Sequence, residues 1–411
     1  MAQLSDDCFA FGGPLLTVEA AQALVEARVA PLPGVEEVAL RDAAGRVLAG
    51  DLAAPRPLPP FFNSAVDGYA FRHADLAAAG DTRLPLDGRT AAGERAAPLA
   101  PHAARRILTG APMPDGADTV MMQEDARLEG GALLLPAGLR QGANCRPPGE
   151  DVARGAVALR AGTRLRAPEL GLAAALGFAR LAVRPRLRVG VFSTGDELAE
   201  PGSPLGPAQT FDSNRFALMA LLARLPATVA DLGILPDDGA ATSRGLREAA
   251  ATHDLLVTSG GVSTGEEDHV RAAVEAAGSL VFWRLAVKPG RPAAMGVVAG
   301  TPVVGLPGNP VAAVVCFLHL VRPLVLRLGG AVPEPLPTFR VEARFSYRKK
   351  AGRREYVRVT LRGDAAEKFP REGAGLLTSL TESHAFAELP EEATSVAPGD
   401  AIRVIPFAAI F

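Results

Sequence analysis

The sequence predicts a multidomain α/β protein built around a doubly wound parallel sheet. The chain has 411 residues, which at about 150 residues per domain indicates several domains. Between residues 187 and 330, continuous apolar segments alternate with helical segments, as in a parallel sheet covered on both faces. Short apolar segments separated by Gly and Pro before this region, and period-two alternation after it, predict two smaller β domains.

The first elements are a helix and a linker. Residues 15–30, LLTVEAAQALVEARVA, have the apolar spacing of an amphipathic helix that either Thr17 or the preceding turn can start. Residues 54–60 contain four prolines and predict an irregular linker. Residues 60–155, with segments such as VDGYAF and ALLLPA, predict a mostly β domain, and residues 156–186 a strand and an Ala/Leu helix.

The alternating region predicts its elements one by one. Strands are expected at 187–194, 227–233, 254–260, 280–287 and 302–308, and helices at 213–225, 240–252, 268–277 and 310–328. Either Asp212 or Ser213 caps the first of these helices. After a Pro-rich break at 332–337, residues 339–347 and 355–361 are expected to form a β-hairpin, and 384–389 and 400–407 to complete a small C-terminal barrel.

Composition excludes several classes of protein. The net charge of -2 excludes a global basic field for nucleic acid. The N-terminus carries Asp6 and Asp7 without a basic region, and the longest apolar run, 311–321, is shorter than a bilayer span. Cys8, Cys145 and Cys316 fit neither a disulfide framework nor a zinc site. We expect a cytoplasmic protein without membrane or nucleic-acid partners.

Four loops that follow predicted strands are the first candidates for a binding site. They span residues 193–197, 258–268, 288–292 and 305–310, and ligands of such sheets bind beyond the carboxyl ends of the strands. A single loop of this composition more often serves only as a turn, but four such loops at one edge of a sheet favour a binding site. The second loop ends in three carboxylates at a helix start, which suits either Mg²⁺ beside a phosphate or only the helix dipole. The candidate binding residues are Thr194, Gly195, Asp196, Ser259, Gly260, Gly261, Val262, Ser263, Gly265, Pro289, Gly290, Arg291, Pro307, Gly308, Asn309 and Pro310.

Lys288 is the sharpest single candidate. The other lysines are Lys349, Lys350 and Lys368, and arginine supplies the rest of the 43 basic residues. A lysine kept at a strand end in so arginine-rich a chain indicates a need for a compact charge, the alternative being chance survival on a surface loop. Asp67, Thr109 and Asp151 lie in turns outside the sheet, where a single carboxylate is usually only solvated.

Ordered motifs along the chain together resemble one known family. They are NSAVDGYAF, TGAPMPDGADTVMMQED, NCRPPGEDV, GVFSTGDEL, FDSNRFAL, GILPDD, TSGGVSTGEEDHV, KPGRPAAMG and LPGNPVAA. The chain resembles molybdopterin molybdenumtransferase, the family of bacterial MoeA and the gephyrin E domain, over nearly its whole length. The resemblance implies a helical connecting domain (1–54 and 156–186), an inserted mostly β domain (55–155), a MogA-like molybdopterin-binding domain (187–330) and a C-terminal β-barrel (331–411).

The resemblance also implies an activity and an assembly. The family inserts molybdate into adenylylated molybdopterin and releases AMP in a Mg²⁺-dependent step, as a homodimer whose two subunits share each active cleft. Molybdopterin adenylyltransferase is a possible transfer partner. Two rival functions are such an adenylyltransferase, which resembles only residues 186–330, and a non-catalytic molybdopterin-binding scaffold.

Site residues carry over by matching motif positions. The implied catalytic set is Asp67, Thr109, Asp151, Glu197, Asp237, Asp268 and Lys288, with Glu197, Asp237 and Asp268 as metal ligands and Arg358 at the molybdate end of the cleft. The chain departs from the family pattern at Arg284 and Arg291, where lysine is frequent, and at Ala312 and Ala374, where serine is frequent. The lost hydroxyls lead to the hypothesis of weaker molybdate binding or a preference for tungstate.

Overall fold

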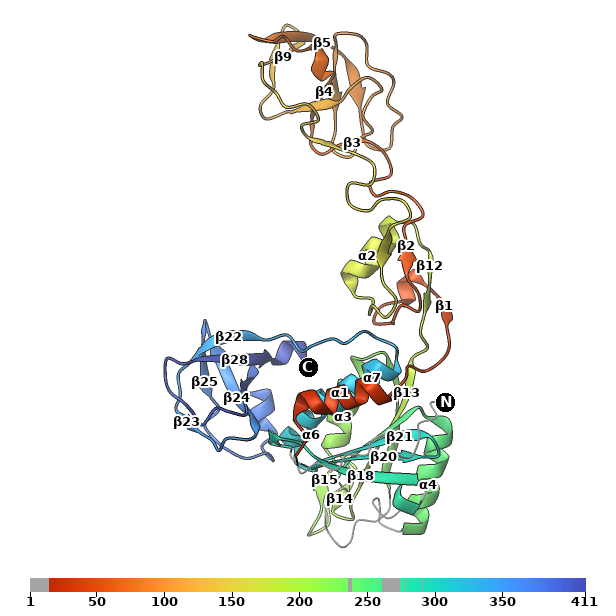
Figure 1. Cartoon of the computed structure of the whole chain (residues 1–411), viewed down its shortest axis with the longest axis vertical. Coiled ribbons are helices and arrows are strands. Elements are labelled where there is room, and N and C mark those ends of the chain that lie inside the picture. The colour runs from red at the N-terminus through yellow and green to blue at the C-terminus, as the bar shows by residue number, and fades with distance from the viewer. Residues whose placement is uncertain (1–14, 236–238, 261–273, 277, 291) are drawn as a thin grey trace. The chain divides into compact units, whose positions relative to one another are not determined.

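The computed structural model describes residues 15–235, 239–260, 274–276, 278–290 and 292–411 (Figure 1). These residues divide into two compact units. Unit 1 comprises Met1–Gly50, Ala161–Arg166 and Arg180–Phe411, and unit 2 comprises Asp51–Arg160 and Ala167–Ala179. The division into four domains stays a prediction.

The predicted α/β sheet is present in unit 1. Its strands lie in the order β16-β13-β17-β21-β20-β18. Their bounds are β13 Leu187–Thr194, β16 Ala227–Leu235, β17 Leu255–Ser259, β18 Gly278–Arg284, β20 Pro292–Val298 and β21 Thr301–Leu306. Neighbours among β16, β13, β17 and β21 are parallel, so the predicted strands meet at a common carboxyl edge.

The parallel sheet also contains one antiparallel strand that the sequence does not predict. The sequence pattern predicts no strand at β20, yet β20 lies between β21 and β18 and is antiparallel to both. Its sequence starts with Pro292 and continues as an apolar run. A proline is tolerated at the first position of a strand. Hydrogen bonds to β21 on one side and β18 on the other hold β20 in the sheet, although its local sequence does not indicate a strand.

Helices cover both faces of this sheet (Figure 1). α1 Val18–Arg28, α3 Asn214–Ala223, α6 Pro310–Cys316 and α7 Arg322–Leu328 share one core with the sheet. α4 Gly239–Thr252 packs through Leu246 and Ala250 on the other face. Thr17 caps α1 by accepting a hydrogen bond from the Ala20 amide at 3.2 Å, as predicted. The Asp212 carboxylate accepts from the Arg215 amide at the start of α3.

The predicted helix over 310–328 is continuous but not uniform. A π-helical turn, Phe317–Val321, joins α6 to α7. Pro310–Leu328 has the length and hydropathy of a membrane span, but 83% of its most apolar window is buried in the protein. It is therefore a core helix, since buried helices can be apolar on all sides. Of the helix predicted over 268–277, only Val274–Ala276 is described, and it is helical.

The C-terminal part of unit 1 is a small closed β-barrel. Its strands are β22 Phe339–Ala343, β24 Arg354–Arg362, β25 Ala365–Lys368, β26 Ala385–Leu389 and β28 Ala401–Pro406. They follow the order β24-β25-β22-β28-β26, and β26 pairs with β24 to close the ring. β19, Val287–Lys288, pairs in parallel with β24.

The hairpin predicted between 339–347 and 355–361 is wrong. β22 pairs with β28 and β25, and β24 forms its hairpin with β25 instead. The turn at Gly363, with φ of 62°, makes this hairpin. The longer segment before β24 carries β23, Tyr347–Arg348, which pairs with β27, Ser395–Val396.

Short elements complete unit 1. They are β1 Glu36–Ala39, a 3₁₀ turn Leu40–Asp42, β12 Arg180–Val183, β14 Leu198–Ala199, β15 Thr210–Phe211, α8 Thr378–Thr381 and a 3₁₀ turn Phe407–Ala409. β1 pairs with β12 in an antiparallel ladder.

Unit 2 is mostly β, as the Gly/Pro-punctuated sequence predicts. A six-stranded sheet has the order β7-β4-β6-β5-β9-β8, and two small cores around Phe71 and Ile107 pack against it. The elements are β2 Leu52–Ala53, β3 Asn63–Ser64, β4 Gly68–Phe71, a 3₁₀ turn His73–Asp75, β5 Thr82–Thr90, β6 Ala104–Ile107, β7 Thr119–Met122, β8 Arg127–Glu129, β9 Ala132–Leu135, β10 Cys145–Arg146, β11 Val157–Leu159 and α2 Ala167–Ala175.

Candidate active site

Three of the predicted loops meet at the carboxyl edge of the sheet in unit 1. The Asn214 side-chain amide, at the start of α3, donates to Ser259 Oγ at 2.8 Å and to the Gly308 carbonyl at 2.7 Å. Ser259 Oγ donates to the Pro307 carbonyl at 3.1 Å. These hydrogen bonds join the ends of β17 and β21, as parallel strand ends predict.

Glycine lets the backbone of these loops pass closely. Gly260 has φ of +87°, and a Cβ there would lie 3.3 Å from the Thr194 carbonyl. The structure thus brings Thr194 and Gly260 side by side. A left-handed residue in such contact favours glycine.

Buried hydroxyl groups without a partner mark the same edge. Ser193 Oγ, Thr194 Oγ1 and Thr258 Oγ1 are buried and have no hydrogen-bond partner among the described residues. Unmet buried polar groups are rare and costly. They lie at the carboxyl ends of β13 and β17. The hydroxyl groups without partners are therefore at the edge of the sheet where a ligand is predicted to bind.

Glu197 presents an exposed carboxylate beside the first loop. Its side chain folds back over Gly195, where a Cβ would lie 2.2 Å from Glu197 Oε2. Gly195 has φ of +136°, a conformation that favours glycine, whereas the exposed Glu197 side chain can move away from an added Cβ. Asp196 is exposed, as is Glu197.

A network that sequence reasoning missed supports these loops. The Arg215 side chain is 2% exposed and forms ion pairs with Asp212 at 2.9 Å, Glu200 at 2.5 Å and Asp231. It therefore ties the start of α3 to β16 and to the segment after β14. The FDSNRF motif contains Asp212 and Arg215, but only the fold brings Glu200 and Asp231 to them.

The Lys288-Pro289-Gly290 loop packs between α6 and the barrel. Cys316 Sγ donates to the Gly290 carbonyl at 2.9 Å, and a Cβ on Gly290 would lie 2.7 Å from that sulfur. Gly290 has φ of +108°. The backbone amide of Val311 in α6 donates to the Ala374 carbonyl at 3.0 Å. The N-terminal end of α6, with Asn309 and Pro310, thus adjoins the barrel loop around Ala374.

Lys288 lies beside a buried carboxylate. β19 pairs with β24 so that Lys288 is opposite Glu355, and Nζ lies 3.1 Å from Glu355 Oε2 and 3.3 Å from the Tyr347 hydroxyl. Tyr347 donates to the same oxygen at 2.8 Å. Burial opposes the charge of Lys288, but the hydrogen bonds to Glu355 and Tyr347 outweigh it and raise the pKa of the ammonium. Lys288 is therefore held and fully charged, with about half of its side chain exposed.

Lys288 and the barrel form a pocket of about 220 Å³, which we call the lysine pocket. Four cations and two carboxylates line it. They are Lys288, Arg358, Lys368, Arg371, Glu355 and Glu372. Lys288 is paired with Glu355, and Lys368 with Glu372 at 2.9 Å. The lining thus carries two more positive than negative charges.

Arg358 has no carboxylate partner among the described residues. Its Nε donates to Ser379 Oγ at 3.1 Å and its Nη2 to the Gly373 carbonyl at 3.0 Å. The residue is 9% exposed, and burial lowers the pKa of its guanidinium. These contacts orient Arg358 in the lysine pocket, where Pro289 and Ala374 also lie. The partners Glu355, Tyr347 and Ser379 were missed, because only the pairing of β19 with β24 and the barrel closure bring them there.

Part of the predicted site lies outside the described residues. This applies to Asp237, Gly261, Val262, Ser263, Gly265, Asp268 and Arg291. Among the described residues, no group of three His, Cys, Asp or Glu side chains could hold a metal ion. Of the three predicted metal ligands only Glu197 is described, so the predicted metal site stays a prediction.

Unit 2 brings two predicted residues together. The Thr109 amide and Oγ1 each donate to Asp67 Oδ1 at 2.7 Å. Both hydrogen bonds lower the pKa of Asp67, and the one from the backbone amide has the larger effect. Asp151 is exposed, and its backbone amide donates to the Leu58 carbonyl at 3.0 Å.

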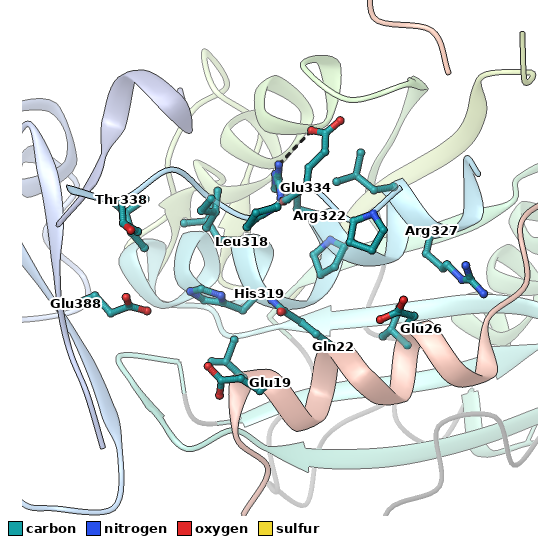
Figure 2. Close-up of a pocket in the computed structure, with 18 of the residues that line it drawn as sticks. Glu19, Gln22, Glu26, Leu318, His319, Arg322, Arg327, Glu334, Thr338 and Glu388 are labelled. Carbon is teal, nitrogen blue, oxygen red and sulfur yellow. Dashed lines mark hydrogen bonds and ion pairs between the residues drawn. The ribbon is translucent and has the colours of Figure 1, made fainter. Parts of the chain in front are cut away.

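A separate hollow of about 410 Å³ contains none of the predicted site residues. Figure 2 shows it between α1, which carries Glu19, Gln22 and Glu26, and the helix that carries His319 and Arg322. Burial, with Arg354 and Arg322 nearby, lowers the pKa of His319 to about 3, so this ring is neutral at physiological pH. The geometry therefore separates this hollow from the candidate active site.

Comparison with known proteins gives the same family along the whole chain. The model "MoeA N-terminal region (domain I and II)" matches residues 16–177, "Probable molybdopterin binding domain" matches 190–327, and "MoeA C-terminal region (domain IV)" matches 340–407. The chain is 38% identical to molybdopterin molybdenumtransferase of Haemophilus influenzae over 380 residues, covering 90% of this chain and 94% of that protein. It is also 38% identical over 382 residues to molybdopterin molybdenumtransferase 2 of Mycobacterium tuberculosis, covering 89% and 94%.

Solved structures agree with these matches. A molybdopterin biosynthesis MoeA protein from Pyrococcus horikoshii OT3 matches with a TM-score of 0.80 at 28% identity, covering 95% of this chain and 99% of that one. A second crystal structure of a MoeA protein from that organism matches at 31% identity with a TM-score of 0.73, covering 96% and 99%. With the strand-end loops and the lysine pocket on one side and these full-length matches on the other, the chain belongs to the MoeA family of molybdopterin molybdenumtransferases.

Proposed function

We propose that this chain inserts molybdate into adenylylated molybdopterin and releases AMP. The observation that carries the proposal is the lysine pocket, whose lining has two more positive than negative charges. Molybdate is a dianion, so its charge matches that excess. The full-length relatives named molybdopterin molybdenumtransferase support the same activity.

Two residues of the lysine pocket, Lys288 and Arg358, are suited to bind the oxyanion in different ways. Lys288 is a compact ammonium fixed by Glu355 and Tyr347, and such a charge attracts an oxyanion without demanding one orientation. Arg358 is a planar donor fixed by Ser379 and Gly373, which suits two parallel hydrogen bonds to an oxyanion. Fixed charges of this kind need little reorganisation when the substrate arrives.

The strand-end loops are suited to the phosphate side of the pterin substrate. The backbone approaches closely at Gly260, which neighbours Gly308, and α6 begins beside them at Pro310. Backbone amides at a helix start favour an anion. We place Thr194, Ser259, Pro307 and Asn309 with these loops as substrate-binding residues.

Mg²⁺ belongs to the proposal as the cofactor of the transfer step. Glu197, Asp237 and Asp268 would hold it, and the exposed carboxylate of Glu197 is of the hard oxygen type that Mg²⁺ prefers. Bound there, Mg²⁺ would neutralise charge that develops on the departing phosphate. Asp67, Thr109 and Asp151 complete the proposed catalytic set, in a cytoplasmic homodimer that receives its substrate from a molybdopterin adenylyltransferase.

The test is an AMP-release assay on the purified full-length chain. With adenylylated molybdopterin and Mg²⁺, we expect AMP release that depends on added molybdate, together with a product that activates a cofactor-free molybdoenzyme. Binding of the substrate without AMP release would replace this proposal with a scaffold function. Formation of adenylylated molybdopterin from molybdopterin and ATP would replace it with adenylyl transfer.

A further inference from the structure

A positively charged hollow lies at the opposite edge of the sheet and has no part in the proposed reaction. It measures about 480 Å³ and adjoins the region where β13 begins at Leu187 and β17 at Leu255. We call it the arginine hollow after four of its lining residues, Arg46, Arg184, Arg186 and Arg188. The candidate active-site loops follow the other ends of the same strands, so this is a different site.

Two of the four arginines are neutralised within the hollow. Arg188 binds Asp254 through two side-chain hydrogen bonds, at 2.7 and 3.1 Å. Arg46 Nη2 lies 2.6 Å from Glu36 Oε2. Glu36 and Asp254 are the carboxylates among the lining residues, so these two pairs use both of them.

The other two arginines have only backbone partners among the described residues. Arg184 Nη1 donates to the Gly34 carbonyl at 3.3 Å, and Arg186 Nη2 to the Ala44 carbonyl at 3.5 Å. Both contacts are long for hydrogen bonds between these groups. Two guanidinium groups therefore contribute uncompensated positive charge to one concave surface.

Arg46 adds a buried donor that lacks an acceptor. The residue is 7% exposed, and its Nε has no hydrogen-bond partner among the described residues. An unmet buried donor on a charged group is costly. Burial and repulsion from Arg46 lower the pKa of Arg186, and the Glu36 carboxylate only partly offsets them.

We propose that the arginine hollow binds a small dianionic oxyanion, either inorganic phosphate or a phosphate monoester. Two uncompensated charges match a dianion, and the forked donors of arginine match the oxygens of a phosphate. Arg46, whose Nε has no acceptor among the described residues, is itself one of the lining residues. This site is independent of the proposed molybdenum transfer, because none of its lining residues belongs to the candidate active site.

The test is calorimetric titration of the full-length chain with inorganic phosphate at low ionic strength. Because the lysine pocket also attracts anions, the titration uses the Lys288→Gln chain as its reference. We expect phosphate binding to persist in that chain and to weaken about tenfold or more when Arg186→Gln is added, since one charge-assisted hydrogen bond is lost. The matched control is Arg362→Gln, because the Arg362 side chain is 65% exposed and lies outside both pockets.

Two further arms keep the test decisive. Arg184→Gln removes the other uncompensated guanidinium and should also weaken binding, while circular dichroism confirms that each variant is folded. Methyl phosphate replaces inorganic phosphate in a parallel titration, and the tighter ligand identifies the source of the anion. Absence of binding for both ligands, or an affinity unchanged by both Arg184→Gln and Arg186→Gln, overturns the proposal.

Discussion

At the scale of single residues, the sequence indicates charged residues better than it indicates their partners. The scarcity of lysine makes Lys288 visible, and the fold places it in a pocket beside Arg358. Glu355, which is 2% exposed, has no comparable signal. Its role depends on the register between β19 and β24, and no local pattern specifies a pairing between segments so far apart in sequence.

The Asp67 and Thr109 pair leads to a prediction about ionisation. Thr109→Val removes the hydroxyl donor and keeps the amide donor, so the pKa of Asp67 should rise toward its ordinary value without reaching it. Because the folded pKa is depressed, the stability linked to Asp67 is present above the unfolded pKa of about 3.9 and is lost as the pH falls through the folded value. The variant therefore narrows the pH range, between the folded and the unfolded pKa of Asp67, over which this stability is lost.

Carboxyl-carbon NMR titration measures this pKa directly. The internal control is Asp118, whose pKa is lowered despite burial by hydrogen bonds from His73, Gln141 and Thr119, none of which changes. An Asp67 pKa that stays the same in Thr109→Val would show that the hydroxyl contributes nothing to the pair.

At the scale of elements, the sequence predicts strands that have strong local signals and misses strands that are defined by pairing. A strand is predicted at 187–194, and β13 spans Leu187–Thr194, because LRVGVFST is a short, mostly apolar segment in which Arg188 is the one charged residue. β20 escapes prediction because its proline and glycine resemble a loop. The predicted hairpin of β22 with β24 fails because barrel closure, a long-range constraint, gives β22 other partners.

The Gly290 loop provides a prediction about packing. Gly290→Ala places a methyl group in close contact with Cys316 Sγ and the Ala312 carbonyl, in a backbone conformation that L-residues rarely adopt. We expect a loss of about 2–4 kcal/mol in the free energy of unfolding, from strain and overpacking together, measured by urea denaturation.

Gly352→Ala separates the two causes. Gly352 has φ of +92°, but a Cβ added there would have no heavy atom within 4 Å, so its substitution should cost only the backbone strain, about 1 kcal/mol. Equal losses in the two variants would mean that contact with α6 does not restrict the Lys288 loop.

At the scale of the whole molecule, the fold class follows from the sequence, and the two compact units make a prediction about cooperativity. Leu133 lies in a core of unit 2 and Leu324 in the main core of unit 1, both 0% exposed. Separate cores form separate cooperative units, so calorimetry should resolve two unfolding transitions. Leu133→Ala should lower the midpoint temperature of the unit 2 transition only, and Leu324→Ala that of the unit 1 transition only. Each substitution should cost its own unit about 2–5 kcal/mol in the free energy of unfolding. One shared transition, lowered by both substitutions, would contradict independent cores.

The candidate site could be predicted only as a set of segments. Residues 193–197, 258–268, 288–292 and 305–310 are expected at one edge, and the described parts of the first, second and fourth of these loops do meet there. The barrel contribution around Arg358 came from family resemblance, because no local rule places a strand of a distant barrel beside the Lys288 loop.

We expect the lysine pocket to bind the oxyanion during molybdenum transfer, and the molybdate dependence of AMP release measures this binding directly. The assay compares the wild-type chain with Lys288→Gln and with Lys350→Gln, a control at an exposed lysine outside the pocket. We predict that Lys288→Gln raises the molybdate concentration for half-maximal AMP release by about tenfold or more, as expected for one lost charge-assisted contact. Lys350→Gln should leave that concentration unchanged. Equal molybdate dependence in all three chains would contradict the assignment of the lysine pocket.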